Sequence, residues 1–307
     1  MEFSFRPPNA DYLGFPATKE GIVRTTQRAE ELGFDTAFLN DHIIVKGPSE
    51  MVASWSNTFD PLVTLGYLAA STSRIRLGTS VLIMPYRNPV ASAKMIATLD
   101  QLSDGRITVG IGAGWLQAEF DALGITYEDR GARTDEYLRV WKACWSPDPI
   151  SFSGNYHSFE DMYCSPKPVQ QPHPPIWIGG SSRPALRRAA QFAAVWQPVP
   201  TPLPKLIEAQ KYLYEACAKI GRSTPPSIRM SFRTNFTALT GKSAKGEDGK
   251  RLIGHGDADE IAADMQGIVD SSDVDSFQIN FNGCRSLVEL EQSMDMFAKA
   301  VRPQLNL

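Results

Sequence analysis

The chain has 307 residues and a formal net charge of −3, with 31 lysines and arginines against 34 aspartates and glutamates. This balance excludes a strongly basic nucleic-acid-binding face, and 42% hydrophobic with 21% charged residues is typical of a globular protein with a sizeable core. The start has no signal-peptide pattern and no apolar run reaches the ~18 residues of a membrane span, so we expect a cytoplasmic protein without nucleic-acid or membrane partners.

Short apolar runs alternate along the first third of the chain with segments whose apolar residues recur at helical spacing. Strands are predicted over residues 3–5, 36–39, 75–84 and 106–111. Helices are predicted over residues 22–32, 61–70 and 90–102. Strands that alternate with helices indicate a parallel sheet.

The alternation is interrupted over residues 115–175. One helix is predicted there, over residues 134–145, because its apolar side chains share one face. The following residues 146–175 are rich in proline and aromatic side chains, which suits an extended surface excursion.

The alternation then resumes to the end of the chain. The predicted strands are 176–178, 194–196, 228–239 and 276–281, and the predicted helices are 184–192, 206–220, 257–269 and 286–301. Residues 242–250 form a predicted polar loop. Eight such units favour an α/β fold, a (β/α)₈ TIM barrel with an insertion after strand 4 at about 115–175, in one domain over residues 1–307. An open doubly wound sheet is the alternative, but no phosphate motif follows the first predicted strand.

Chemistry in such a barrel lies in the loops after the strands. Asp41 and His42 directly follow the second predicted strand, and an imidazole at this place can act as a general acid or base near neutral pH. The alternative is that Asp41 caps a turn and His42 lies on the surface. The four histidines and four cysteines have no metal-ligand spacing, which predicts no metal site.

Two glycine-rich turns follow later strands. Residues 110–115 nearly match a dinucleotide-binding fingerprint, but Trp115 stands in the place of the last glycine. Gly179, Gly180 and Ser181 precede a predicted helix, whose free N–H groups would suit a phosphate. The alternative there is a plain turn with a serine cap.

Three stretches, residues 112–124, 130–138 and 166–181, together resemble the luciferase-like monooxygenase superfamily, and specifically its F420-dependent oxidoreductase branch. The resemblance implies a barrel that binds F420 or FMN at the carboxyl ends of its strands. It also implies that His42 lies near the reacting ring face and that the Ser80–Val81 peptide bond is cis. The implied cofactor-binding residues are Asp41, Ser80, Val81, Ala113, Gly114, Gly179, Gly180 and Ser181.

Two positions depart from the sugar-phosphate dehydrogenases of this superfamily. Trp115 replaces a glutamate, and Lys46 replaces a tryptophan four residues after the histidine. Both departures argue against sugar-phosphate oxidation, and Trp115 suits an apolar or planar substrate better. A tryptophan that only packs in the core is the other interpretation.

These observations predict an oxidoreductase that transfers a hydride between F420 and a small organic substrate, with catalytic His42 managing the proton. We expect Asp41 to contact the cofactor ring rather than to form a dyad with His42, and the protein to be a homodimer. An FMN-dependent monooxygenase working with a flavin reductase and O₂ is the first alternative. A non-catalytic flavin-binding protein is the second.

Overall fold

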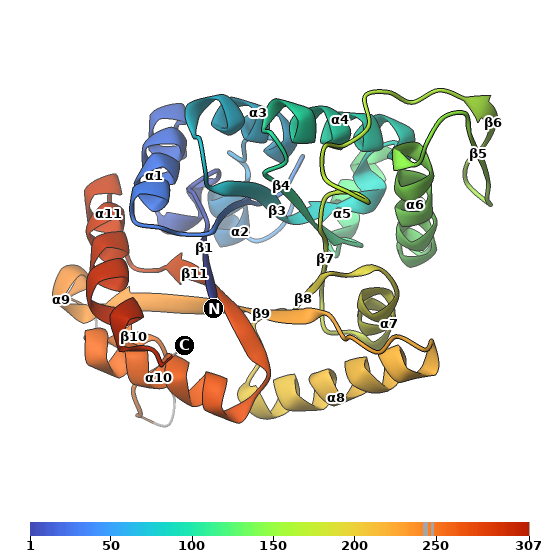
Figure 1. Cartoon of the computed structure of the whole chain (residues 1–307). Helices are drawn as coiled ribbons and strands as arrows, with labels where there is room; N and C mark the ends of the chain where they lie inside the picture. Colours follow the sequence, from blue (N-terminus) through green and yellow to red (C-terminus); the bar gives the residue numbers. More distant parts are fainter. Residues whose placement is uncertain (242–244, 247–248, 307) are drawn as a thin grey trace.

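The computed structural model describes residues 1–241, 245–246 and 249–306. Eight parallel strands close into a barrel inside a ring of helices, as predicted (Figure 1). The barrel strands are β1 (Glu2–Phe5), β2 (Thr36–Leu39), β3 (Arg76–Ile83), β4 (Ile107–Gly112), β7 (Ile176–Gly179), β8 (Val195–Gln197), β9 (Ser227–Phe236) and β11 (Val274–Phe281). Strand β1 pairs with β2 and β11, and β8 pairs with both β7 and β9, so the sheet has no free edge. The alternative of an open sheet is therefore wrong.

The helices surround the barrel in chain order. They are α1 (Lys19–Glu31), α2 (Ser49–Trp55), α3 (Pro61–Ser71), α4 (Pro89–Leu102), α5 (Gln117–Leu123), α6 (Arg130–Trp145), α7 (Arg183–Phe192), α8 (Leu203–Lys219), α9 (Thr237–Thr240), α10 (Ala258–Ser271) and α11 (Leu287–Met296). Polar caps start several of them: the side chains of Thr18, Asp60 and Asn88 accept backbone N–H groups at the starts of α1, α3 and α4.

The boundaries differ from the predictions at a few places. Strand β9 ends at Phe236 rather than at residue 239, because the short helix α9 and then Gly241, with φ +66°, turn the chain away. A two-residue strand, β10 (His255–Gly256), pairs beside β9. Helix α11 ends at Met296 and continues as a π-helical turn, Phe297–Val301. The predicted loop 242–250 lies largely outside the described residues.

The predicted insertion lies between β4 and β7. It contains α5, α6 and an antiparallel hairpin of β5 (Ile150–Ser153) and β6 (Ser158–Met162), which stands at the periphery beyond α6 (Figure 1). The sequence predicts only an extended excursion here, so the hairpin differs from that expectation. That residues 1–307 form a single domain stays a prediction.

A buried carboxylate fastens this hairpin to α6. Glu136 accepts the backbone N–H groups of Asn155, Tyr156 and His157 at 2.6, 2.8 and 2.9 Å. Burial raises the pKa of Glu136, but these three N–H donors outweigh it and the pKa is lowered. Because its pKa is lowered in the folded state, Glu136 stabilises the fold at pH values above the ordinary carboxyl pKa of about 4.3. This stabilisation is lost as the pH falls below that pKa.

Glu136→Gln is expected to destabilise the hairpin by about 1–3 kcal/mol, because the new amide N–H₂ faces a backbone donor. Hydrogen exchange of residues 154–157 should accelerate in the variant, and in the wild type on acidification. Glu160→Gln, an exposed change on β6, is the control. Equal protection in both variants would contradict this role of Glu136.

The interior of the barrel is filled near the amino ends of the strands. The rings of Phe38 and Trp177 lie 4.5 Å apart, and the Arg229 guanidinium stacks 4.0 Å from the Trp177 ring. A Cβ on Gly78 would lie 2.8 Å from the Phe38 ring and 2.6 Å from a backbone oxygen of Thr108, which explains the glycine inside β3. The space open to ligands is therefore at the carboxyl ends.

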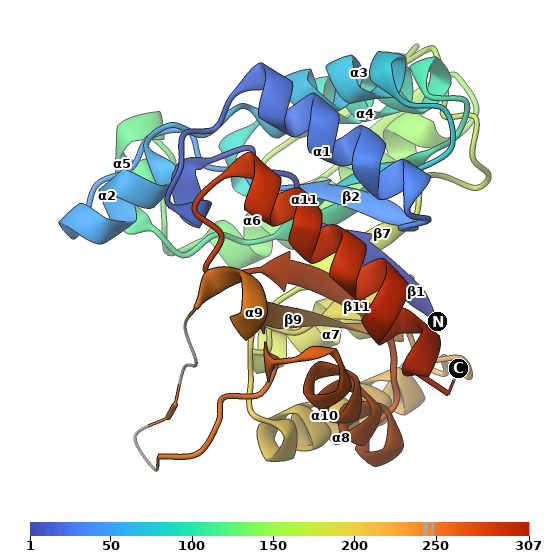
Figure 2. The same cartoon turned by 90° about the vertical axis from the view of Figure 1, so that its left-hand side faces the viewer.

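Figure 2 shows these two ends clearly. The β11 arrowhead points toward the end where α2 and α5 lie, and both chain termini lie at the opposite end. In the part of the chain that the structure describes, none of the helices combines the length and apolar composition needed to cross a bilayer.

Candidate active site

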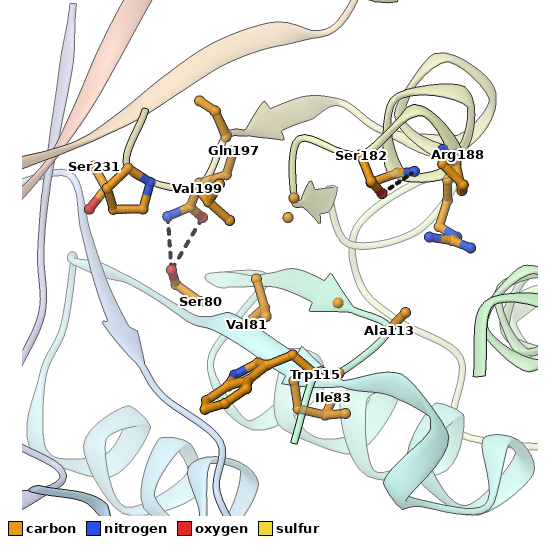
Figure 3. A pocket seen from close by; sticks show the side chains of 18 of the residues that line it. Ser80, Val81, Ile83, Ala113, Trp115, Ser182, Arg188, Gln197, Val199 and Ser231 are labelled. Carbon is orange, nitrogen blue, oxygen red and sulfur yellow. Dashed lines mark hydrogen bonds between the residues drawn. The ribbon is translucent and has the colours of Figure 1, made fainter. Parts of the chain in front are cut away.

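A cavity of about 570 Å³ opens at the carboxyl ends of the strands. Six of the eight predicted cofactor-binding residues line it: Ser80, Val81, Ala113, Gly114, Gly179 and Gly180. Figure 3 shows side chains from β3, β8, β9 and α7, and from the loop after β4, that surround this larger cavity.

A second, smaller cavity of about 160 Å³ adjoins it. Asp41 and His42 line this one, and Ser80, Val81 and Trp115 line both cavities. The structure thus brings the predicted residues other than Ser181 into two adjoining cavities, with the end of β3 between them.

The end of β3 is shaped by close packing against two glycines. The Ser80–Val81 peptide bond is cis, as predicted. The Val81 side chain lies between Gly112 and Gly179, and a Cβ on either glycine would come within 2.8 Å of a Val81 methyl group. Any larger residue at these two positions would displace Val81 from the cavity wall.

Hydrogen-bonding side chains run across the base of the larger cavity. Gln197 donates to the Ser80 hydroxyl at 2.9 Å (Figure 3). It also donates to the side-chain amide oxygen of Gln278 at 2.9 Å. Asn280 continues the row by donating to the Ser231 hydroxyl at 2.8 Å. Amides offer donors and acceptors side by side, which suits the alternating N–H and C=O groups of a heterocyclic ring.

The start of α7 borders the larger cavity. Ser182 caps α7 by accepting the Ala185 N–H, while the Ser181 hydroxyl instead accepts the Val199 N–H and is not among the cavity-lining groups. Gly180 has φ +110°, so a side chain there would strain the backbone as well as obstruct a ligand.

Four arginines line the larger cavity: Arg6, Arg130, Arg188 and Arg233. Arg188 is paired with Asp135 at 2.6 Å. Arg130 donates to the carbonyls of Gly114 and Tyr127. Among the described residues neither Arg6, Arg130 nor Arg233 has a carboxylate within ion-pair distance. The described lining contains four arginines and one acidic residue, Glu128, so it carries excess positive charge suited to a phosphate.

Asp41 is engaged in a buried ion pair. One carboxylate oxygen accepts the Ile83 N–H at 2.8 Å and Arg87 at 2.7 Å, and the other accepts Arg87 at 2.9 Å. Burial lowers the pKa of Arg87, but the carboxylates of Asp41 and Asp60 outweigh it and raise that pKa. As expected, Asp41 makes no dyad with His42; its contact with a cofactor ring stays a prediction.

The partner of His42 is Glu119, on α5. The Nδ1 atom of His42 lies 3.1 Å from Glu119 Oε2, and the two side chains are 13% and 1% exposed. The same carboxylate accepts the Tyr86 hydroxyl at 2.8 Å and the Ile43 N–H at 2.9 Å. The sequence reasoning missed Glu119, although it lies inside the stretch that carried the family resemblance.

Aromatic rings enclose the imidazole. Trp55, from the unpredicted helix α2, lies 5.1 Å from the His42 ring, and Trp115 lies 6.4 Å from it edge-on. Trp115 is 60% exposed, so the interpretation of it as a core residue is wrong.

Groups of three or more His, Cys, Asp or Glu side chains that could hold a metal do not occur among the residues described.

The residues of the larger cavity fit a phosphorylated flavin-type cofactor. The amide row matches the polar edge of its ring, the two glycines seat the Val81 side chain in the cavity wall, and the arginines with the start of α7 match its phosphate.

The family model described as luciferase-like monooxygenase matches residues 4–248. An FMNH₂-dependent dimethylsulfone monooxygenase of Pseudomonas putida is 38% identical over 138 residues, which cover 44% of this chain and 38% of that protein. This chain therefore matches about two-fifths of that relative's length.

Two further similarities concern F420-dependent proteins. An F420-dependent glucose-6-phosphate dehydrogenase of Amycolatopsis mediterranei is 31% identical over 177 residues, covering 55% of this chain and 52% of that protein. The structure of an F420-dependent secondary alcohol dehydrogenase with an F420-acetone adduct superimposes with a TM-score of 0.81 at 18% identity, over 100% of this chain and 99% of that one. At that identity the likeness concerns the fold alone.

Proposed function

Because the chain belongs to the luciferase-like monooxygenase family, whose members are oxidoreductases, we propose that it is an F420-dependent oxidoreductase acting on a small organic substrate. One observation carries the proposal: a cationic cavity sized for a cofactor adjoins a small aromatic cavity that contains an imidazole. The shared wall at Ser80, Val81 and Trp115 would bring cofactor and substrate face to face.

The larger cavity would hold the cofactor. Gln197 and Gln278 would meet the polar edge of the ring, Val81 would support its face, and Arg130 with the start of α7 would bind the phosphate. When bound, F420 supplies or accepts a hydride.

The smaller cavity would hold the substrate. His42 would take a proton from the substrate hydroxyl, or return one to a carbonyl oxygen, at its ring nitrogen Nε2. Trp55 and Trp115 would exclude water and pack against a flat or apolar substrate. Lysine and arginine are absent from the described lining of this cavity, which argues against a phosphorylated substrate.

A side-by-side titration of the cofactor-free protein with F420 and FMN tests the proposal. We expect saturable binding of F420 and much weaker binding of FMN. Tight FMN binding without measurable F420 affinity would overturn it.

The second candidate is an FMN-dependent monooxygenase that works with a flavin reductase and O₂. The similarity to the dimethylsulfone monooxygenase favours it specifically. Substrate oxygenation by the protein with FMN, a reductase and O₂ would establish this candidate, whereas cofactor binding without turnover of either kind would indicate a non-catalytic flavin-binding protein. That the protein is a cytoplasmic homodimer remains part of the proposal, and sedimentation velocity tests its assembly.

Arg130→Met is expected to weaken F420 binding about tenfold or more, because hydrogen bonds to charged groups contribute ~1.5–3 kcal/mol. Arg133→Met is the matched control, since Arg133 lies one turn further along α6 and pairs with Asp129. Equal dissociation constants for the two variants in a fluorescence titration would remove Arg130 from the proposed phosphate site.

A further inference from the structure

The carboxylate of Glu119 joins His42 to the loop that follows it and to η2 (Met84–Tyr86), the single helical turn after β3. Its Oε1 atom accepts the backbone N–H groups of Ile43 and Ile44 at 2.9 and 3.3 Å. Its Oε2 atom lies 2.8 Å from the Tyr86 hydroxyl and 3.1 Å from His42 Nδ1. The hydrogen-bond partners of this buried carboxylate among the described residues are therefore all nitrogen or hydroxyl groups.

The protonation of these groups follows from their surroundings. Burial raises the pKa of Glu119, but hydrogen bonds from His42, Ile43 and Tyr86 outweigh it and lower the pKa, so the group is an anion at neutral pH. Burial and the bond to Glu119 raise the pKa of Tyr86, so its hydroxyl keeps its proton. An ionised carboxylate only accepts hydrogen bonds, and the imidazole nitrogen facing it must then carry hydrogen.

We propose that Glu119 is a positioning residue that holds neutral His42 in the tautomer protonated at Nδ1, leaving Nε2 as the proton acceptor. This inference rests on the proposed function in one respect, the use of the free Nε2 atom as the proton acceptor in the reaction. In the Ser-His-Asp triad a buried aspartate has the same effect on its histidine, and the asparagine variant there loses about 10⁴-fold in kcat through the wrong tautomer.

Glu119→Gln separates tautomer control from simple packing. The backbone N–H groups of Ile43 and Ile44 cannot change roles, so the amide oxygen must stay at the Oε1 position. The amide N–H₂ group then faces His42 Nδ1, which must accept instead of donate. The proton of neutral His42 is thereby expected to move to Nε2, and the free acceptor nitrogen is lost.

Tyr86→Phe is the matched control. It removes the other donor to Oε2 but leaves the carboxylate charged and still bonded to the backbone of Ile43. The Nδ1 tautomer of His42 should persist in this variant. A purely structural role for Glu119 would instead leave the tautomer the same in both variants.

Nitrogen-15 NMR of the cofactor-free protein, at a pH where the histidines are neutral, reads out the tautomer directly. The His42 signals are assigned by their loss in His42→Gln. We expect the wild type and Tyr86→Phe to show protonated Nδ1, and Glu119→Gln to show protonated Nε2, with matching circular dichroism confirming that all three fold. A wild type protonated at Nε2, or a Glu119→Gln variant that keeps Nδ1 protonated, would overturn the inference.

This outcome is distinguishable from failure of the proposed function. If the protein binds FMN instead of F420, the tautomer prediction is unaffected, because the experiment contains no cofactor. If the tautomer is wrong while F420 binds, only the role of Glu119 falls.

Discussion

Replacing His42 by alanine is expected to lower kcat by about 10²–10⁴-fold, the usual contribution of general acid–base catalysis. The imidazole lies in the smaller cavity between Trp55 and Trp115, and its Nδ1 atom is occupied by Glu119. The variant should still fold and bind cofactor, because the larger cavity does not include His42. Steady-state kinetics with a cofactor titration would separate these effects.

The fall in kcat that comes from lost proton transfer must be separated from the fall that comes from lost packing against Trp55 and Trp115. His42→Asn and His42→Gln keep polarity and much of the bulk but cannot exchange a proton near neutral pH. They should be as slow as His42→Ala if the imidazole transfers a proton. Near-normal turnover of these two variants would make His42 a residue that only positions its neighbours.

Asp41→Asn is expected to destabilise the fold by about 3 kcal/mol, because it breaks a buried ion pair. The Asp41 side chain is fully buried against Arg87, and its charge is removed while the guanidinium stays. Asp60→Asn offers a matched control on the same arginine, since Asp60 is 43% exposed. An exposed partner contributes no more than about 1 kcal/mol.

Urea denaturation of both variants measures this difference. Similar unfolding free energies for the two would show that Arg87 does not depend on Asp41. A stable Asp41→Asn variant that had lost cofactor affinity would assign Asp41 to ligand binding rather than to support of the β3 end.

Much of the barrel was predictable because the sequence features that specify its strands and helices are local. Buried parallel strands are short apolar runs, and the amphipathic helices between them carry the 3.6-residue period, so all eight strands were found. The turn at Gly179 was also visible, since glycines between a strand and a capped helix have a local signature. The hairpin of β5 and β6 had no such signal, because proline and aromatic residues dominate its surroundings.

The site was only partly predictable because its key contacts join distant segments. His42 and Glu119 are 77 positions apart, and neither α2 nor α5 exceeds seven residues, which leaves little periodicity to detect. Trp115 stands where the sugar-phosphate dehydrogenases carry a glutamate. Glu119, four residues later and within α5, places a carboxylate beside His42.

The neighbouring side chains of Trp55 and His42 come from separate structural elements. Trp55 comes from α2, a separate short helix outside the barrel, whereas His42 directly follows barrel strand β2. Changes within α2 can therefore reshape the space beside the imidazole without disturbing the strand end, Glu119 or the cofactor-side wall. Under the proposed function, substitutions within α2 would change substrate preference while His42 and Glu119 stay on their own elements.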